Sequence, residues 1–201
     1  MGNPQGFEAF HQRSITDRDA FWAEQAQLVD WHKPFDRVCN YDNPPFARWF
    51  EGGLTNLCHN AVDRHLKDRA DQNALIYVST ETDTERTYSF RELHAEVQRM
   101  AAVLLAQGVK KGDRVLIYMP MIPEATFAML ACARIGAIHS VVFGGFASHS
   151  LANRIEDASP VLIVSADAGS RGGKVVEYKP LLDEAIRLSS HKPTSVILVN
   201  R

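Results

Sequence analysis

The feature that most constrains this chain is the alternation of strand and helix patterns from residue 74 onward. Short apolar runs alternate with segments whose apolar residues recur every three or four positions, the spacing of an amphipathic helix. The runs that predict strands are 74–79, 86–88, 115–119, 138–142, 161–164 and 195–199. This order predicts an α/β fold with a mostly parallel sheet and helices on both of its faces.

Start and stop signals support the helices between these runs. Ser89 and Glu92 form a capping box ahead of a strongly periodic segment, and Gly108 ends that segment. Pro123 stands where a first helical turn tolerates proline, and Gly136 ends the helix that follows it. The remaining helical patterns are 56–69, a segment after Gly145 with helical spacing through Leu151, Ile155 and Ala158, and 180–188.

The first quarter of the chain has a different character. Residues 1–15 are polar and lack periodicity, and Thr16 predicts the N-cap of a helix that ends near Asp30. Residues 31–53 are rich in Pro, Asn, Gly and aromatic side chains, which predicts a loop pinned by its rings rather than a linker. We interpret residues 1–55 as an extension wrapped on a domain that starts at residue 56.

Composition excludes several classes of function. The chain has 22 basic and 24 acidic residues, with no sustained Lys/Arg cluster, so a nucleic-acid partner is not expected. No apolar stretch is long enough to cross a membrane, and the first twenty residues lack the apolar run of a secretory signal. The three cysteines show no CxxC spacing, which predicts neither disulfides nor zinc and favours a reducing, cytoplasmic location.

Two predicted strands end in loops that contain a glycine pair. One is the run from Phe143 through Gly144 and Gly145, and the other is 166–174, which ends with Arg171, a glycine pair and Lys174. Because ligands of open α/β sheets collect beyond the carboxyl ends of the strands, these loops predict a binding site. From the local residues alone, a tight strand-to-helix turn and a solvated basic turn remain open as alternatives.

The chemistry of the second loop favours phosphate. Arg171 can fork onto phosphate oxygens, and Lys174 adds a mobile point charge, so the pair suits a terminal phosphate on a large ligand. The loop lacks the GxxxxGK[ST] pattern of a P-loop, and the chain has no GxGxxG. The eight histidines are scattered, and neither a catalytic residue nor a metal site is predicted.

Three runs resemble the N-terminal part of the AMP-forming acyl-CoA synthetases of the adenylate-forming superfamily. They are YSFREL at 88–93, GVKKGDRV at 108–115 and MLACARIGA at 129–137. HSVVFGGF at 139–146 and RGGK at 171–174 resemble the narrower short-chain branch, the acetyl-CoA and propionyl-CoA synthetases. The extension, whose aromatic residues include Trp22 and Trp31, resembles that branch too, so the resemblance covers nearly the whole chain.

The resemblance implies a role for both loops. By position in the family's pattern, Arg171 and Lys174 would lie near the 3′-phosphate ADP portion of coenzyme A (CoA), and Phe143 and Gly144 would border the same path. Acetate enzymes usually have arginine where this chain has Lys174, so charge is kept and forked bonding is lost. The runs 166–170 and 178–182 look more like those of the propionate enzymes.

The implied parent reaction joins a carboxylate to ATP, giving an acyl-adenylate and pyrophosphate, and then transfers the acyl group to CoA with release of AMP. ATP and Mg²⁺ would be used at sites beyond this sequence, because the family's ATP loop, catalytic lysine and acyl pocket lie downstream. We therefore expect an inactive N-terminal fragment of a propionate–CoA ligase, with the remainder of the parent chain as its partner. The alternatives are an acetate–CoA ligase fragment, a non-catalytic CoA or nucleotide-binding module, and an assembly domain that uses the aromatic extension for contacts.

Overall fold

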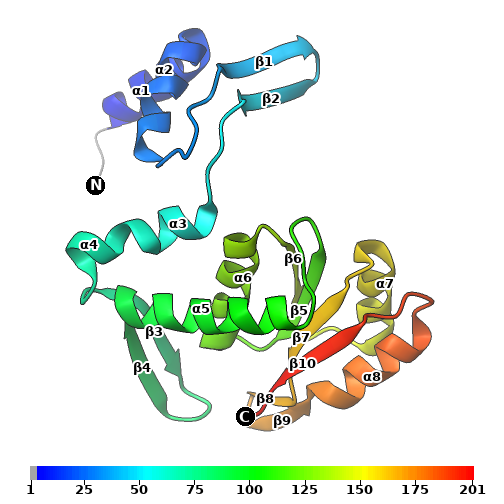
Figure 1. The fold of residues 1–201 in the computed structure, drawn as a ribbon. Coiled ribbons are helices and arrows are strands. Elements are labelled where there is room, and N and C mark those ends of the chain that lie inside the picture. The colour runs from blue at the N-terminus through cyan, green and yellow to red at the C-terminus, as the bar shows by residue number, and fades with distance from the viewer. Residues whose placement is uncertain (1–3) are drawn as a thin grey trace. The chain divides into compact units, whose positions relative to one another are not determined.

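The computed structural model describes residues 4–201 and divides the chain into two compact units. The first unit runs to Asn56, and the second runs from Leu57 to Arg201. Figure 1 shows the helices and strands of each unit.

The first unit begins with two helices, α1 (Pro4–Thr16) and α2 (Arg18–Gln25), and a short 3-10 helix, η1 (Ala26–Leu28). The expectation that the first helix starts at Thr16 is wrong, because residues 4–15, which lack helical periodicity in the sequence, already form α1. Thr16 does not cap the next helix either, because its hydroxyl donates to the Gln12 carbonyl, 3.0 Å away, in the last turn of α1. A tertiary contact accounts for α1: the Phe10 ring meets the buried Phe21 ring edge-on, with centroids 4.7 Å apart.

The region expected to be a loop, 31–53, contains an antiparallel hairpin of β1 (Arg37–Asn43) and β2 (Phe46–Glu51). Its rings do contact one another, since Trp31 lies 5.3 Å from Phe35 and 5.5 Å from Phe50 between centroids. The sequence analysis missed these strands because proline and glycine are typical of loops. Their cross-strand pairs include Cys39 opposite Trp49. The wrapping of this unit on the next stays a prediction.

The second unit is built on a four-stranded parallel sheet in the order β10-β7-β5-β6. The strands are β5 (Arg114–Met119), β6 (Ile138–Phe143), β7 (Leu162–Ala166) and β10 (Ser195–Val199). The central strand β7 is buried along its whole length, as expected of a strand covered on both faces. All four strands run the same way, so their carboxyl ends meet at one edge.

Helices cover both faces of this sheet, which confirms the predicted α/β class (Figure 1). On β5, Val115 and Ile117 belong to one buried cluster and Leu116 and Tyr118 to the other, because successive side chains point to opposite faces. The first cluster includes residues of α5 (Phe90–Ala106) and α6 (Pro123–Ile135), and the second includes residues of α7 (Ser148–Ala158) and α8 (Tyr178–Leu188).

Local sequence signals correctly predict most of these helices and strands. β3 (Asn73–Ser79) and β4 (Thr84–Ser89) form the expected hairpin, and α5 begins at the expected capping box. The Ser89 amide donates to Glu92 over 2.7 Å, and the Glu92 amide donates to the Ser89 hydroxyl over 3.3 Å. The helix expected over 56–69 is divided into α3 (Leu57–Ala61), the 3-10 turn η2 (Asp63–His65) and α4 (Leu66–Arg69).

The segment after β7, expected to be a loop, forms a second hairpin. It consists of β8 (Ala168–Arg171) and β9 (Lys174–Glu177), joined by Gly172 and Gly173. Both glycines have positive φ, +57° and +71°, as a two-residue type I′ turn requires. The run AGSR is short and lacks apolar alternation, so its sequence gave no strand signal.

Candidate ligand site at the carboxyl ends of the sheet

The two glycine-bearing loops meet at the carboxyl edge of the sheet. The guanidinium carbon of Arg171 lies 5.7 Å from the centroid of the Phe143 ring, within the range of a cation–π contact. A Cβ on Gly145 would lie 2.7 Å from Arg171 Nη1, so the guanidinium also approaches the backbone of the first loop. Phe143 is 62% exposed, which leaves this cation and ring accessible to a ligand.

Tyr178 holds the two loops together, and sequence reasoning missed it. Its buried ring lies between the loops: a Cβ on Gly144 would lie 2.3 Å from Tyr178 Oη, and a Cβ on Gly169 would lie 2.8 Å from Tyr178 Cε2. Glycine is required at both positions because the ring approaches the backbone so closely. The glycines signalled a close neighbour, but only the fold identifies that neighbour as the first residue of α8.

A second tyrosine, Tyr118, is hydrogen-bonded to the backbone just after the first loop. The Tyr118 hydroxyl donates to the Phe146 carbonyl over 2.9 Å, and the Tyr118 and Tyr178 rings lie 5.0 Å apart. Burial, with a smaller effect of Tyr178, raises the pKa of Tyr118 to about 12. Burial also raises the pKa of Tyr178 above 10.0, against the opposing effect of Arg171. Both phenols stay protonated at neutral pH, so they position the loops and do not act as bases.

Arg171 and Lys174 are paired directly across the β8–β9 hairpin. Cross-strand partners project on the same face, and like charges in that position destabilise a hairpin unless an anion screens them. Both residues are exposed. The arrangement presents two cations to an anion, although among the described contacts none joins Lys174 to the Phe143 loop. Of the four predicted residues, Arg171, Phe143 and Gly144 therefore converge, and Lys174 lies at the margin.

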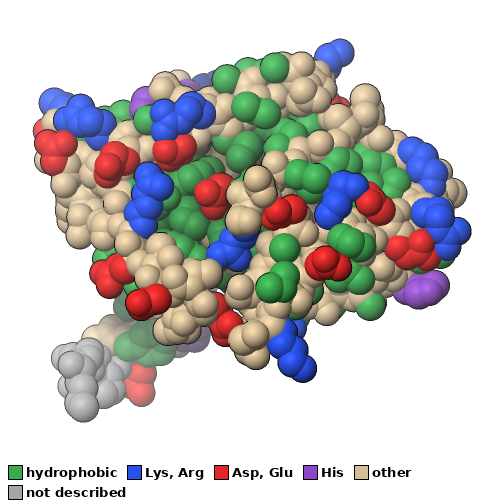
Figure 2. All heavy atoms as spheres, turned by 90° about the horizontal axis from the view of Figure 1, so that it is seen from below, with side chains coloured by type: hydrophobic (Ala, Val, Ile, Leu, Met, Phe, Trp, Pro, Cys, Tyr) green, Lys and Arg blue, Asp and Glu red, His purple; other side chains and the backbone are tan. Residues whose placement is uncertain are grey.

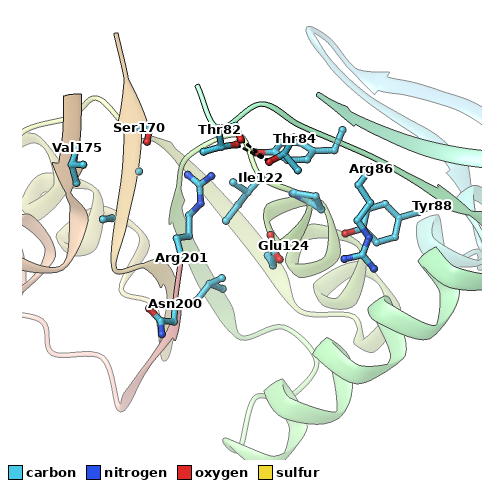
Figure 3. Close-up of a pocket in the computed structure, with 15 residues that line it drawn as sticks. Thr82, Thr84, Arg86, Tyr88, Ile122, Glu124, Ser170, Val175, Asn200 and Arg201 are labelled. Carbon is cyan, nitrogen blue, oxygen red and sulfur yellow. Dashed lines mark hydrogen bonds between the residues drawn. The ribbon is translucent and has the colours of Figure 1, made fainter. Parts of the chain in front are cut away.

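A cavity of about 460 Å³ lies beside this site and is distinct from it. Figure 3 shows Ser170 and Val175 at one side of the cavity, Arg86 and Tyr88 at the other, and Arg201 between them. Ser170 and Val175 project from the hairpin face opposite to Arg171, because neighbouring residues of a strand alternate. None of the four predicted site residues lines this cavity.

The described residues offer little sign of other binding chemistry. Within 4–201, no group of three His, Cys, Asp or Glu side chains is arranged to hold a metal ion, and no helix has the length and apolarity to span a bilayer. Cys39, Cys58 and Cys132 are buried and unpaired. On the face shown in Figure 2, acidic and basic side chains are interspersed, and the described residues seen there form no extended patch of one sign.

Comparison with protein families shows which family the chain belongs to. The sequence model described as "AMP-binding enzyme" matches residues 62–200, and the one described as "Acetyl-coenzyme A synthetase N-terminus" matches residues 7–61. The chain therefore belongs to the AMP-binding enzyme family, which confirms the family resemblance of its motifs.

Individual relatives agree with this assignment. The chain is 63% identical to the propionate–CoA ligase of Salmonella typhimurium over 97% of its own length and 31% of that protein. It is 50% identical to an acetyl-coenzyme A synthetase of Methylobacterium radiotolerans, again over 97% of the chain and 31% of the relative. Among solved structures, an acetoacetyl-CoA synthetase from Streptomyces lividans superimposes with a TM-score of 0.87 at 32% identity, over 97% of this chain and 30% of that one. The chain thus spans about 31% of the length of the curated relatives it matches.

Proposed function

We propose that this chain forms the first part of an AMP-forming ligase that activates propionate and transfers it to CoA. The observation that carries the proposal is the convergence of Arg171 with the Phe143 loop at the carboxyl edge of the sheet. The 63% identity to a propionate–CoA ligase supports propionate as the acid. Acetate is the alternative substrate, supported by the 50% identity to an acetyl-coenzyme A synthetase.

The proposed reaction has two steps. The carboxylate attacks the α-phosphate of ATP, which gives an acyl-adenylate and releases pyrophosphate. The CoA thiol then attacks the acyl carbon, which gives the thioester and releases AMP. Mg²⁺ would neutralise the phosphates of ATP in the first step. The residues for this chemistry would come from the rest of the parent chain, and the present residues would bind and orient CoA.

Each predicted residue has a distinct part in this proposal. Arg171 binds the 3′-phosphate of CoA through charge-assisted, forked hydrogen bonds, and Lys174 adds a point charge beside it. Phe143 and Gly144 border the path of the nucleotide portion, with Phe143 offering an exposed apolar ring and Gly144 a backbone free of side chain.

The domain organisation belongs to the same proposal. Residues 1–55 would be the extension found in acetyl- and propionyl-CoA synthetases, and 56–201 the first part of the AMP-binding domain. The ranges that the two family models match, 7–61 and 62–200, support this division. We propose a cytoplasmic location, which three unpaired cysteines favour. Because a rat relative is named as mitochondrial, cell fractionation is the test.

The test of the CoA site uses the full-length enzyme that contains this chain. Arg171→Ala should raise the KM for CoA about ten- to a hundredfold, because a charge-assisted contact to phosphate is lost. The adenylation half-reaction should stay nearly unchanged, since CoA takes no part in it.

Dephospho-CoA, which lacks the 3′-phosphate, is the matched control for that test. The unaltered enzyme should bind it more weakly than CoA, and the Arg171→Ala enzyme should scarcely distinguish the two. Equal discrimination by both enzymes would show that Arg171 is only a solvated turn residue. Comparing kcat/KM for propionate and acetate in the same enzyme decides the acid.

A stand-alone binding module is the competing function from another class. The gene sequence downstream of Arg201 separates the two. An in-frame Ser/Thr/Gly-rich loop ending in PKG supports the ligase, whereas a stop codon in the native gene supports the module.

A further inference from the structure

One acidic side chain contacts the tip of the β8–β9 hairpin from far along the chain. The Gly172 amide donates to Glu81 Oε1 over 3.1 Å, and the Gly173 amide donates to Glu81 Oε2 over 3.0 Å. A single carboxylate thus accepts from both residues of the turn that separates Arg171 from Lys174.

The backbone of the turn is suited to hold an anion. Consecutive amides in a turn with left-handed residues can point to one side and form a concave anion receptor. Both glycines adopt positive φ, and a Cβ on either would meet nothing within 4 Å. Neighbouring side chains therefore do not fix the turn by packing. Besides the pairing of Arg171 with Lys174 across the hairpin, the described contacts of the turn include these two bonds to Glu81.

Glu81 is itself placed by a structured segment. It lies in the connection between β3 and β4, where the Thr82 hydroxyl oxygen lies within hydrogen-bond distance of the Ser79 hydroxyl, at 2.9 Å, and of the Thr84 hydroxyl, at 3.1 Å. These bonds close the connection on itself, so the carboxylate is presented from a folded turn.

The contact leaves the cations of the hairpin available. Among the described ion pairs, none joins Glu81 to Arg171 or Lys174, and the Arg171 guanidinium instead lies over the Phe143 ring. A carboxylate that neutralised the cations would compete with a ligand phosphate. Among the described hydrogen bonds, Glu81 accepts only from backbone amides, so it contacts the turn without neutralising either cation.

We propose that Glu81 is a positioning residue for phosphate binding: by holding the amides of Gly172 and Gly173, it orients Arg171 and Lys174 toward the ligand. The inference rests on the proposed CoA-binding function of the hairpin and adds a residue that the motif does not contain.

The test replaces Glu81 in the full-length enzyme and uses Glu85→Ala as the matched control, since that change removes the same charge from the same β3–β4 hairpin. Glu81→Ala should raise the KM for CoA about three- to tenfold, because the turn loses two hydrogen bonds at an exposed position. The KM for dephospho-CoA and the adenylation rate should not change. Glu81→Gln, whose one amide oxygen can still accept, should be intermediate. Glu85→Ala should behave as the unaltered enzyme does.

Two further measurements separate positioning from other roles. If Glu81 acts through Arg171 and Lys174, adding Glu81→Ala to a variant that carries both Arg171→Ala and Lys174→Ala should have no further effect on the KM for CoA. Amide hydrogen exchange at Gly172 and Gly173 needs no ligand, and it should become about tenfold faster in Glu81→Ala and stay unchanged in Glu85→Ala.

Each contrary result has a definite meaning. A lower KM for CoA in Glu81→Ala would show that the carboxylate competes with the ligand, and unchanged exchange at the glycines would show that it does not hold the turn. Either outcome overturns the inference. Failure of the proposed function is seen elsewhere: Arg171→Ala would then keep its preference for CoA over dephospho-CoA, whatever the exchange rates in Glu81→Ala.

Discussion

Tyr178 occupies the space that a side chain at position 144 would need: a Cβ on Gly144 would lie 2.3 Å from Tyr178 Oη and 2.8 Å from its Cε1. The same ring lies against Gly169, and it belongs to the buried cluster beneath α7 and α8. The end of β6, the start of β8 and the start of α8 are therefore fixed to one another through a single aromatic ring.

This relationship predicts the effect of enlarging Gly144. Gly144→Ala should lower the free energy of unfolding by about 1–3 kcal/mol, because the added methyl group overlaps a buried ring. Adding Tyr178→Phe should restore part of the loss, since it removes the nearest atom and leaves the ring carbons close. Urea denaturation of the two single variants and the double variant measures this coupling. Strictly additive losses would show that the two residues do not share this space.

The cross-strand pair gives a second prediction. Lys174→Ala should raise the KM for CoA by only about threefold, less than Arg171→Ala, because an exposed point charge without forked bonding contributes little. Lys174→Arg, which restores a fork at the same position, should lower the KM below that of the unaltered enzyme. Steady-state kinetics of the full-length variants tests both. A larger effect at Lys174 than at Arg171 would reverse the assigned roles.

The sequence predicts features that depend on neighbouring residues, and it does not predict contacts between residues that are distant in the sequence. The capping box of Ser89 and Glu92 is local, so its residues identify it. The meeting of the Phe143 and Arg171 loops follows from a rule of parallel sheets, which needs only the order of the strands. Tyr178 lies far along the chain from Gly144, as Glu81 does from Gly172 and Gly173, and no local pattern predicts these contacts.

The missed elements have the same origin. The Phe10–Phe21 contact accounts for α1, and the cross-strand pairing of short segments accounts for β8 and β9. In both cases a tertiary or pairing interaction outweighs a weak local preference. Local sequence signals in such a chain therefore predict the scaffold well and the residues that support the site poorly.

A third prediction concerns the chain of 201 residues by itself. It should form no acyl-adenylate from ATP and either propionate or acetate, because in the proposed ligase the residues for adenylation would come from the rest of the parent chain. Release of pyrophosphate from the purified chain is the measurement, with the full-length enzyme as the positive control. Release above background would mean that the chain carries its own adenylation chemistry.

The last prediction concerns acid stability and the contact between α7 and the segment after α8. The Glu156 carboxylate accepts from the Ser190 amide, from the Ser190 hydroxyl over 2.9 Å and from the Ser189 hydroxyl over 3.0 Å. These bonds, the Ser190 amide first, hold the pKa of Glu156 below its ordinary value of 4.5. A carboxyl whose pKa is lowered by folding stabilises the fold above its unfolded pKa, and this stabilisation is lost as the pH falls through the folded value.

Glu156→Gln should therefore lower the free energy of unfolding at neutral pH, and the difference from the unaltered chain should shrink as the pH falls below about 4.5. Urea denaturation across this range measures the difference, and Glu85→Gln, an exposed carboxylate on β4, corrects for the loss of one negative charge. If the difference stayed constant down to the pH where the chain unfolds, the bonds to Ser189 and Ser190 would not depend on the charge of Glu156.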